Sequence, residues 1–193
     1  MNKGRLEAFS DGVFAIIITI MVLELHAPEG ASFAALKPIL PKFISYVLSF
    51  IYIAIYWNNH HHMFQAVKHV NGKVLWCNLL LLFCLSLVPF VTAWMGENHF
   101  SSSPVALYGM VMLIAALSYP ILLQSLIKLH GKDSLLGASI GKDFKGKISI
   151  AIYCVGILVS FVNSWIGFAL YVLVAIIWFI PDRRIEKRIG KEM

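Results

Sequence analysis

Six long apolar stretches, separated by short polar segments, run through the chain. Each is close to the roughly 20 residues that a helix needs to cross the hydrocarbon core of a bilayer. The pattern predicts an all-α integral membrane protein with six transmembrane helices, forming one unit over residues 1–193 with no room for a separate soluble domain. The predicted spans cover about residues 6–26, 41–63, 74–95, 104–127, 148–163 and 166–180.

The composition agrees with a membrane location. Of the 193 residues, 59% are hydrophobic and 13% are charged, whereas soluble proteins average about 45–50% and about 25%. The first stretch has the length and basic flank of a signal peptide, but it contains carboxylates and no clear cleavage site, so we interpret it as a span. Cys77, Cys84 and Cys154 lie within apolar stretches without metal-ligand spacing, which indicates small buried side chains.

The basic residues are distributed unevenly about these spans. Fourteen of the 16 lysines and arginines precede the first span, or follow the second, fourth or sixth. Lys37 and Lys42 lie on the other side. By the positive-inside rule both termini are cytoplasmic, and the net charge of +6 reflects topology rather than nucleic-acid binding. The expected location is the inner (plasma) membrane.

The first span has one aliphatic face that includes a hydroxyl group. At about 100° per residue, this face consists of Gly12, Ile16, Thr19, Ile20 and Leu23. Such a stripe is typical of helix packing or of a lipid-facing surface, and periodicity alone favours that interpretation. The alternative is that the stripe lines a pathway through the membrane.

Two carboxylates share the opposite face of the same span. Glu7 and Asp11 are four residues apart, so their like charges repel unless cations or donors compensate them. A charged side chain at membrane depth costs about 2.5–3.5 kcal/mol and therefore faces protein or water. Arg5 lies about 9 Å along the axis from Asp11, on another side of the helix, so they would meet only through another helix or subunit. Asn78, in the third span, needs a partner and is a candidate for this network.

The second span ends in the polar run Asn58-Asn59-His60-His61-His62. Consecutive helical residues point about 100° apart, so the three histidines cannot all ligate one ion, and hydrogen-bonding roles are favoured over a metal site. Trp57 fits an interfacial or packing aromatic side chain. The sequence has no arginine repeat, no Thr-Val-Gly-Tyr-Gly filter, no Walker loop and no hydrolase motif. It indicates neither a voltage sensor nor an enzyme.

Several of these residues resemble a known family. The motif Arg5-x3-Phe9-Ser10-Asp11 is similar to the signature of the transmembrane protein 175 family, which comprises lysosomal potassium channels and their bacterial relatives. Similarity is clear over about residues 5–95. The likeness continues at the end of the second span and in the third, at Trp57, His60, Phe64, Asn78-Leu79 and Leu87-Val88-Pro89-Phe90.

The resemblance implies a homotetramer in which the first helices line a central pore. It implies that Ile16 and Leu23 form a hydrophobic constriction and that the hydroxyl group of Thr19 assists selectivity for permeant potassium. All three belong to the aliphatic face that helical arithmetic gives independently. The remaining motif residues are assigned to a structural and gating network at the base of the first helix, namely Arg5, Phe9, Ser10, Asp11, Trp57, His60 and Asn78.

The expected function is therefore a potassium-permeable, modestly selective cation channel without a voltage sensor, cofactor or tightly bound metal. The expected partners are further copies of the chain, membrane lipid and potassium ions. The alternative is a proton-coupled secondary transporter that uses Asp11 and His60 as a relay. The fourth to sixth spans are expected to form a lipid-facing outer layer.

Overall fold

The computed structural model describes residues 3–131, 133–139 and 144–179, and all of its regular structure is helical. The spans end within about three residues of their predicted positions; the first and the fifth end three residues early, and the fourth ends three residues late. The elements are α1 (Lys3–Leu23), the 3-10 helix η1 (Phe33–Ile39), α2 (Leu40–Gln65), α3 (Gly72–Ser86), α4 (Val88–Glu97), α5 (Ser102–His130), α6 (Leu135–Ser139), α7 (Phe144–Ser160) and α8 (Ser164–Phe179).

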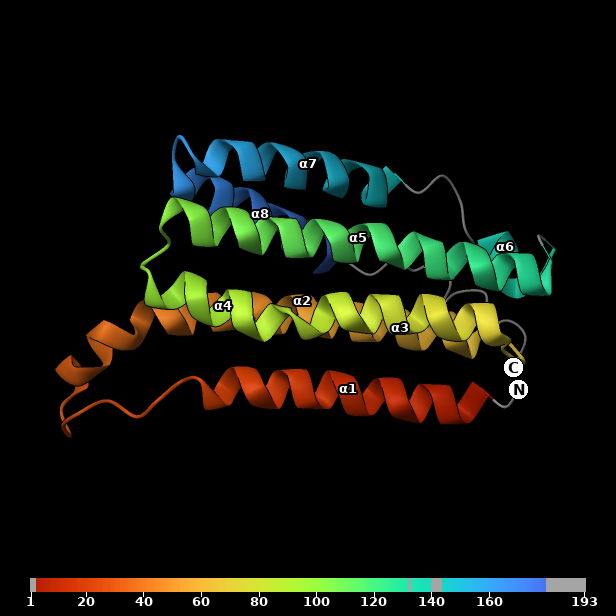
Figure 1. Cartoon of the computed structure of the whole chain (residues 1–193), viewed down its shortest axis with the longest axis horizontal. Helices are drawn as coiled ribbons and strands as arrows, with labels where there is room; N and C mark the ends of the chain where they lie inside the picture. The colour runs from red at the N-terminus through yellow and green to blue at the C-terminus, as the bar shows by residue number, and fades with distance from the viewer. Residues whose placement is uncertain (1–2, 132, 140–143, 180–193) are drawn as a thin grey trace.

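The long helices run alternately in opposite directions, side by side in one bundle (Figure 1). α1 starts at the same end at which α2 and α5 finish. Lys3 Nζ donates to Phe64 O at 2.9 Å, and the rings of His69 and His130 lie 4.7 Å apart at that end. We call this the basic end; the described lysines in or next to the helix ends that are directed toward it are Lys3, Lys68, Lys73, Lys128, Lys145 and Lys147.

Local signals in the sequence set several helix ends. Pro41 lies in the first turn of α2, where its missing N–H costs no hydrogen bond. The side chain of Asn71 accepts a hydrogen bond from Val74 N at 3.0 Å and caps α3. Gly131 follows α5 with a φ of 92°, a conformation that few other residues adopt. These residues fix the turns between the spans.

The predicted third span is one membrane crossing made of two helices. The break lies at Leu87, between α3 and α4. Pro89 follows it, and because proline has no N–H, the carbonyl group of Leu85 loses its helical partner. Pro120, by contrast, lies within an uninterrupted α5. Both prolines lie within predicted spans, but only Pro89 adjoins a break in the helix.

Four segments are long and apolar enough to cross a membrane in the described part of the chain. They are Lys3–Leu23, Phe33–Gln65, Gly72–Glu97 and Ser102–His130. α7 has 17 residues and α8 has 16, which correspond to about 25 Å of helix each. Residue 180, the last of the predicted sixth span, and the basic residues after it lie outside the described part.

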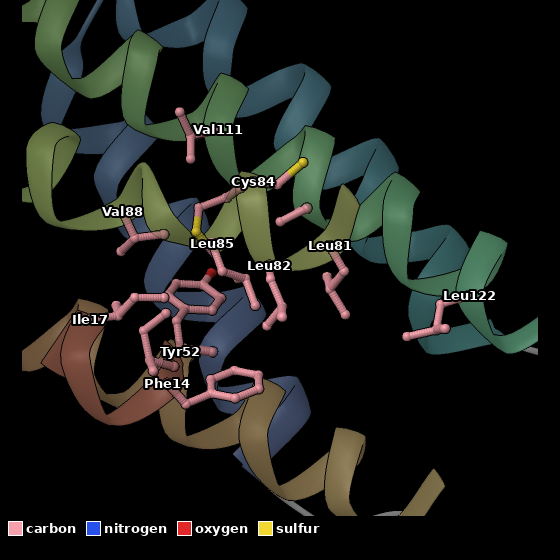
Figure 2. Close-up of a cluster of buried hydrophobic side chains, with 14 of the residues drawn as sticks. Phe14, Ile17, Tyr52, Leu81, Leu82, Cys84, Leu85, Val88, Val111 and Leu122 are labelled. Atoms are coloured by element: carbon pink, nitrogen blue, oxygen red, sulfur yellow. The ribbon is translucent and has the colours of Figure 1, made fainter. Parts of the chain in front are cut away.

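The core contains aliphatic and aromatic side chains from α1, α2, α3, α4 and α5 (Figure 2). Phe14 and Ile17 of α1 point toward Tyr52 of α2 and toward Leu82 and Leu85 of α3. α1 packs mainly against α2, α3 and α4. It contributes one face to the core and leaves the other exposed.

α5, α7 and α8 pack closely through small residues. A Cβ added at Gly109 of α5 would overlap the hydroxyl group of Tyr171 on α8, and one added at Gly156 of α7 would lie 2.6 Å from the same ring. Membrane helices use small residues in this way because lipid supplies no hydrophobic force to press them together. Tyr171 therefore acts as the centre of a three-helix contact.

Candidate functional site

The two faces of α1 have different surroundings. Its buried side chains repeat at helical spacing and are Leu6, Ser10, Phe14, Ile17 and Met21. The opposite face is the aliphatic stripe, and there Ile16 is 59% exposed and Leu23 70% exposed. A Cβ at Gly12 would meet no atom within 4 Å. The stripe is thus an apolar surface that the described part of the chain leaves uncovered.

Thr19 provides the stripe with its oxygen atom. Its Oγ1 donates to Ala15 O at 2.9 Å, in the preceding turn of the same helix. A hydroxyl group has one proton and two acceptor lone pairs. Because the proton is directed back to the backbone, the lone pairs remain available to a cation beside the exposed face. Ile16 lies about 4.5 Å along the axis from Thr19, and Leu23 lies about 6 Å away on the other side.

A buried chain of polar groups fastens α1 to α2 and α3. Asn78 Nδ2 of α3 donates to Ser10 Oγ at 3.0 Å, and Ser10 Oγ donates to Leu6 O at 2.8 Å. Asn78 Oδ1 pairs with His60 Nε2 of α2 at 2.8 Å. Ser10, Asn78 and His60 are all buried. Asn78 is therefore partnered by Ser10 and His60 rather than by either carboxylate.

The two carboxylates of α1 have separate partners. Asp11 Oδ1 accepts a hydrogen bond from Trp57 Nε1 of α2 at 2.9 Å. Glu7 lies 3.7 Å from Lys3 Nζ, one turn away on its own helix. Each acid thus has a donor or cationic partner, although neither partner is Asn78, the candidate that the sequence suggested, and Asp11 remains exposed.

Arg5 and Phe9 lie outside this buried network. The side chain of Arg5 is exposed, and Phe9 is 55% exposed on the same side of α1 as Ile16. The four residues of the Arg5-x3-Phe9-Ser10-Asp11 motif therefore fall into two groups within one chain. Ser10 and Asp11 hold α1 to the bundle, whereas Arg5 and Phe9 are presented outward.

The consecutive histidines His60 and His61 have different environments. His60 bonds Asn78, and its ring lies 4.5 Å from that of Phe64. His61 stacks on Trp57 with ring centroids 5.6 Å apart and pairs with Gln65 Nε2 at 2.8 Å. Among the described residues there is no group of three or more His, Cys, Asp or Glu side chains that would hold a metal ion.

Sequence reasoning missed a second buried polar cluster, deeper in the bundle. Ser49 Oγ of α2 lies 2.6 Å from Thr92 Oγ1 of α4 and 3.1 Å from Tyr108 OH of α5. Nearby, Tyr52 OH donates to Tyr171 O at 2.5 Å. The signal was the presence of tyrosines inside apolar stretches, because a buried tyrosine hydroxyl group needs a partner.

Comparison with known proteins identifies the family. The family model described as endosomal/lysosomal potassium channel TMEM175 matches residues 5–89. A potassium channel of Chryseobacterium sp. (strain P1-3) is 58% identical over 187 residues, covering 97% of each chain. The chain belongs to the TMEM175 family. The expectation drawn from the Arg5-x3-Phe9-Ser10-Asp11 motif is confirmed.

Other TMEM175 relatives extend the comparison. The crystal structure of a lysosomal potassium-selective channel TMEM175 homolog from Chamaesiphon minutus matches the fold with a TM-score of 0.77 at 28% identity, covering 92% of this chain and 96% of that one. The zebrafish (Danio rerio) protein named endosomal/lysosomal proton channel TMEM175 is 26% identical over 93% of this chain but only 36% of its own length. The chain thus has a TMEM175 channel fold and spans about a third of the vertebrate protein.

Proposed function

We propose that four copies of this chain form a potassium-permeable cation channel in which one α1 helix from each copy lines a central pore. The observation that carries the proposal is the exposed stripe on α1, at Ile16, Thr19 and Leu23, on a helix whose other face is well packed. A closed ring of identical subunits would bring four such faces around one axis. The names of the Chryseobacterium and Chamaesiphon relatives support potassium as the ion.

In this tetramer Ile16 and Leu23 form two apolar rings about 10 Å apart along the pore. A narrow apolar segment disfavours water and thereby forms a barrier to ions, so it gates by wetting and drying. The closed state is the dry one. Opening requires the rings to widen enough for a hydrated or partly hydrated cation to pass.

The proposed source of selectivity is the Thr19 ring between the two constrictions. A potassium ion gives up its water at a smaller cost than a sodium ion, and four hydroxyl oxygens would replace part of the lost shell. The hydrogen bond from Thr19 to Ala15 O supports this role because it leaves the oxygen lone pairs uncommitted. Selectivity of this kind is modest, since no rigid cage of carbonyl groups surrounds the ion.

The polar chain Ser10–Asn78–His60 and the pair Asp11–Trp57 are proposed to hold the base of α1 in register. Both reach α1 from the side opposite the stripe, so they do not contact the ion path. Arg5 and Phe9 are proposed to complete the network at the contact between subunits, which their outward position supports. In this view a shift of α1 against α2 and α3 is the gating movement.

The proposed topology has six crossings, with α7 and α8 as the fifth and sixth, and with the basic end in the cytoplasm of the cell that makes the protein. The described lysines at that end support this orientation by the positive-inside rule. At the other end, Lys42 Nζ lies 2.8 Å from Glu97 Oε1, so its charge is compensated. The proposed location is the inner (plasma) membrane.

The alternative function is a proton-coupled transporter with Asp11 and His60 as its relay. The vertebrate TMEM175 relatives are named proton channels, so proton flux through this protein is also worth measuring. The geometry favours the channel, however, because Asp11 pairs with Trp57 and His60 with Asn78, so no hydrogen bond joins the two relay groups. A transporter would lose all flux with Asp11→Asn, whereas a channel would keep conducting.

The experiment that tests the proposal is planar-bilayer recording of the purified protein under opposing potassium and sodium gradients. Thr19→Ala is expected to lower the permeability ratio of potassium to sodium about two- to tenfold, the effect of losing an interaction of about 0.5–1.5 kcal/mol. Thr19→Ser keeps the hydroxyl group and should retain the ratio. Equal ratios in all three proteins would overturn the role of Thr19, and a saturable flux without unitary currents would overturn the channel.

A further inference from the structure

A cavity of about 300 Å³ lies on the side of α2 that faces α5, α7 and α8. Its walls include five aromatic side chains, Tyr52 and Tyr56 from α2, Tyr119 from α5, Tyr153 from α7 and Trp178 from α8. Its size falls in the range of small-molecule sites, which are concave and mostly apolar with a few polar groups. It is separate from the exposed stripe of α1.

The sequence accounts for the open space. Ala116 and Pro120 of α5 line one wall, and Gly146 of α7 lines another. Alanine and glycine fill little volume, and a proline inside a helix both lacks an N–H and pushes away the carbonyl group four residues earlier. Here that carbonyl group belongs to Ala116. The helices therefore enclose a space that larger side chains would have filled.

The inner part of the cavity is suited to an apolar chain. Several of its polar groups are already paired: Trp178 Nε1 donates to Ser149 Oγ at 2.9 Å, and Ser149 Oγ donates to Lys145 O at 2.8 Å. Tyr52 OH donates to the backbone carbonyl of Tyr171. An entering alkyl chain would break none of these hydrogen bonds and would lie against aromatic rings.

The mouth of the cavity is positively charged. Lys147, in the first turn of α7, lies about 9 Å along the helix axis from Tyr153. Lys147 and Gln124 are both exposed, and none of the cavity-lining residues within the described ranges is acidic. Gln124 lies late in α5 and Lys147 early in α7, so this side of the cavity is directed toward the basic end, where the long stem of a lysine extends toward lipid head groups.

We propose that this cavity binds an amphiphile with a single alkyl chain and an anionic head group, a phosphate or a carboxylate. The chain lies among the tyrosines and Trp178, and the head group pairs with Lys147. The same chemistry comes from two sources, one chain of an anionic phospholipid in the adjacent leaflet or a free alkyl acid. Basic clusters next to membrane spans attract anionic lipids in the same way.

The test uses the full-length protein in phosphatidylcholine nanodiscs, with dodecyl phosphate as the probe and native mass spectrometry as the readout. Lys147→Gln is expected to weaken binding about 10- to 100-fold, as the loss of a charge-assisted hydrogen bond does, while Lys128→Gln, at the same end but outside the cavity, leaves it unchanged. Ala116→Phe fills the cavity and should abolish binding. Ile114→Phe, on the exposed side of α5, should not.

The source of the ligand and the sign of the charge on its head group are tested in the same system. Phosphatidylglycerol retained by the protein and displaced by dodecyl phosphate would identify the phospholipid, and binding of dodecyl phosphate alone would identify the free amphiphile. Either result supports the site. An equal loss of dodecyl phosphate binding in Lys147→Gln and Lys128→Gln would overturn the site. Binding that survives Ala116→Phe would overturn it too. Preference for dodecyltrimethylammonium would overturn it as well, because aromatic walls would then be attracting a cation.

Discussion

Side-chain hydrogen bonds determine which face of α1 is turned toward the bundle. Asn78 donates to Ser10, and Trp57 donates to Asp11, so α1 is held at two adjacent residues by two different helices. Rotation of α1 would break both contacts and bury the aliphatic stripe. The exposure of Ile16 and Leu23 therefore depends on polar groups that do not themselves belong to the stripe.

Asn78→Leu tests this anchor. The substitution leaves His60 without its buried partner, and we expect a loss of about 1–3 kcal/mol in the free energy of unfolding. Losses of free energy near the lower limit of this range are typical of hydrogen bonds between membrane helices. Thermal unfolding in detergent, followed by tryptophan fluorescence, measures the effect. Asn98→Leu is the control, because Asn98 bonds only within its own helix end and is exposed; similar losses in both variants would contradict the anchor.

The sequence predicted these residues better than their pairing. The positions of Ser10, Asp11, Trp57, His60 and Asn78 followed from the family motif and from the cost of polar groups in lipid. Their partners did not follow, because helical periodicity assigns a residue to a face but does not say which helix packs there. Ser10 and Asn78 are 68 residues apart in sequence, and that contact appears only when the helices are assembled.

At the scale of elements, α1 combines a packed face with an uncovered one. Angular spacing at about 100° per residue sufficed to predict the stripe, since it depends on the helix alone. The division of the third span into α3 and α4 was harder to predict, because Pro89 and Pro120 look alike in sequence and only one interrupts its helix. The surrounding packing decides whether a proline is accommodated.

Ile16→Asn tests the proposed constriction. A polar side chain in a narrow apolar ring favours water there, so we expect larger unitary conductance or a higher open probability in bilayer recordings. Ile114→Asn is a matched control, because Ile114 is also an exposed isoleucine but lies on α5. Equal currents in wild type, Ile16→Asn and Ile114→Asn would show that residue 16 does not limit ion flow.

Gly109→Ala tests the contact between α5 and α8. The added methyl group would lie 2.5 Å from Cζ of Tyr171, so the ring must move or α8 must separate. Overpacking of this kind costs about 1–3 kcal/mol, which should appear as earlier thermal unfolding. Gly72→Ala is the control, since nothing lies within 4 Å of its added methyl group. A stability equal to that of Gly72→Ala would show that α8 docks differently.

At the scale of the whole molecule, one chain is proposed to supply one side of a pore. Positive charges gather at the basic end and an ion pair compensates Lys42 at the other, which supports the proposed orientation of the bundle. The number of subunits could not be predicted from periodicity or composition, because neither describes contacts between chains. It entered through the family resemblance, and it remains part of the proposal.

The most direct test of the account asks whether water and ions reach the exposed face of α1. Leu23→Cys and Leu158→Cys are a matched pair, since the two leucines are 70% and 71% exposed, on α1 and α7. In a background with Cys77, Cys84 and Cys154 replaced by alanine, a cationic methanethiosulfonate is added during bilayer recording. If α1 lines the pore, we expect the reagent to block the current through Leu23→Cys channels and to leave the current through Leu158→Cys channels unchanged. Current that persists after reagent addition in Leu23→Cys, or equal block in both variants, would contradict a pore lined by α1.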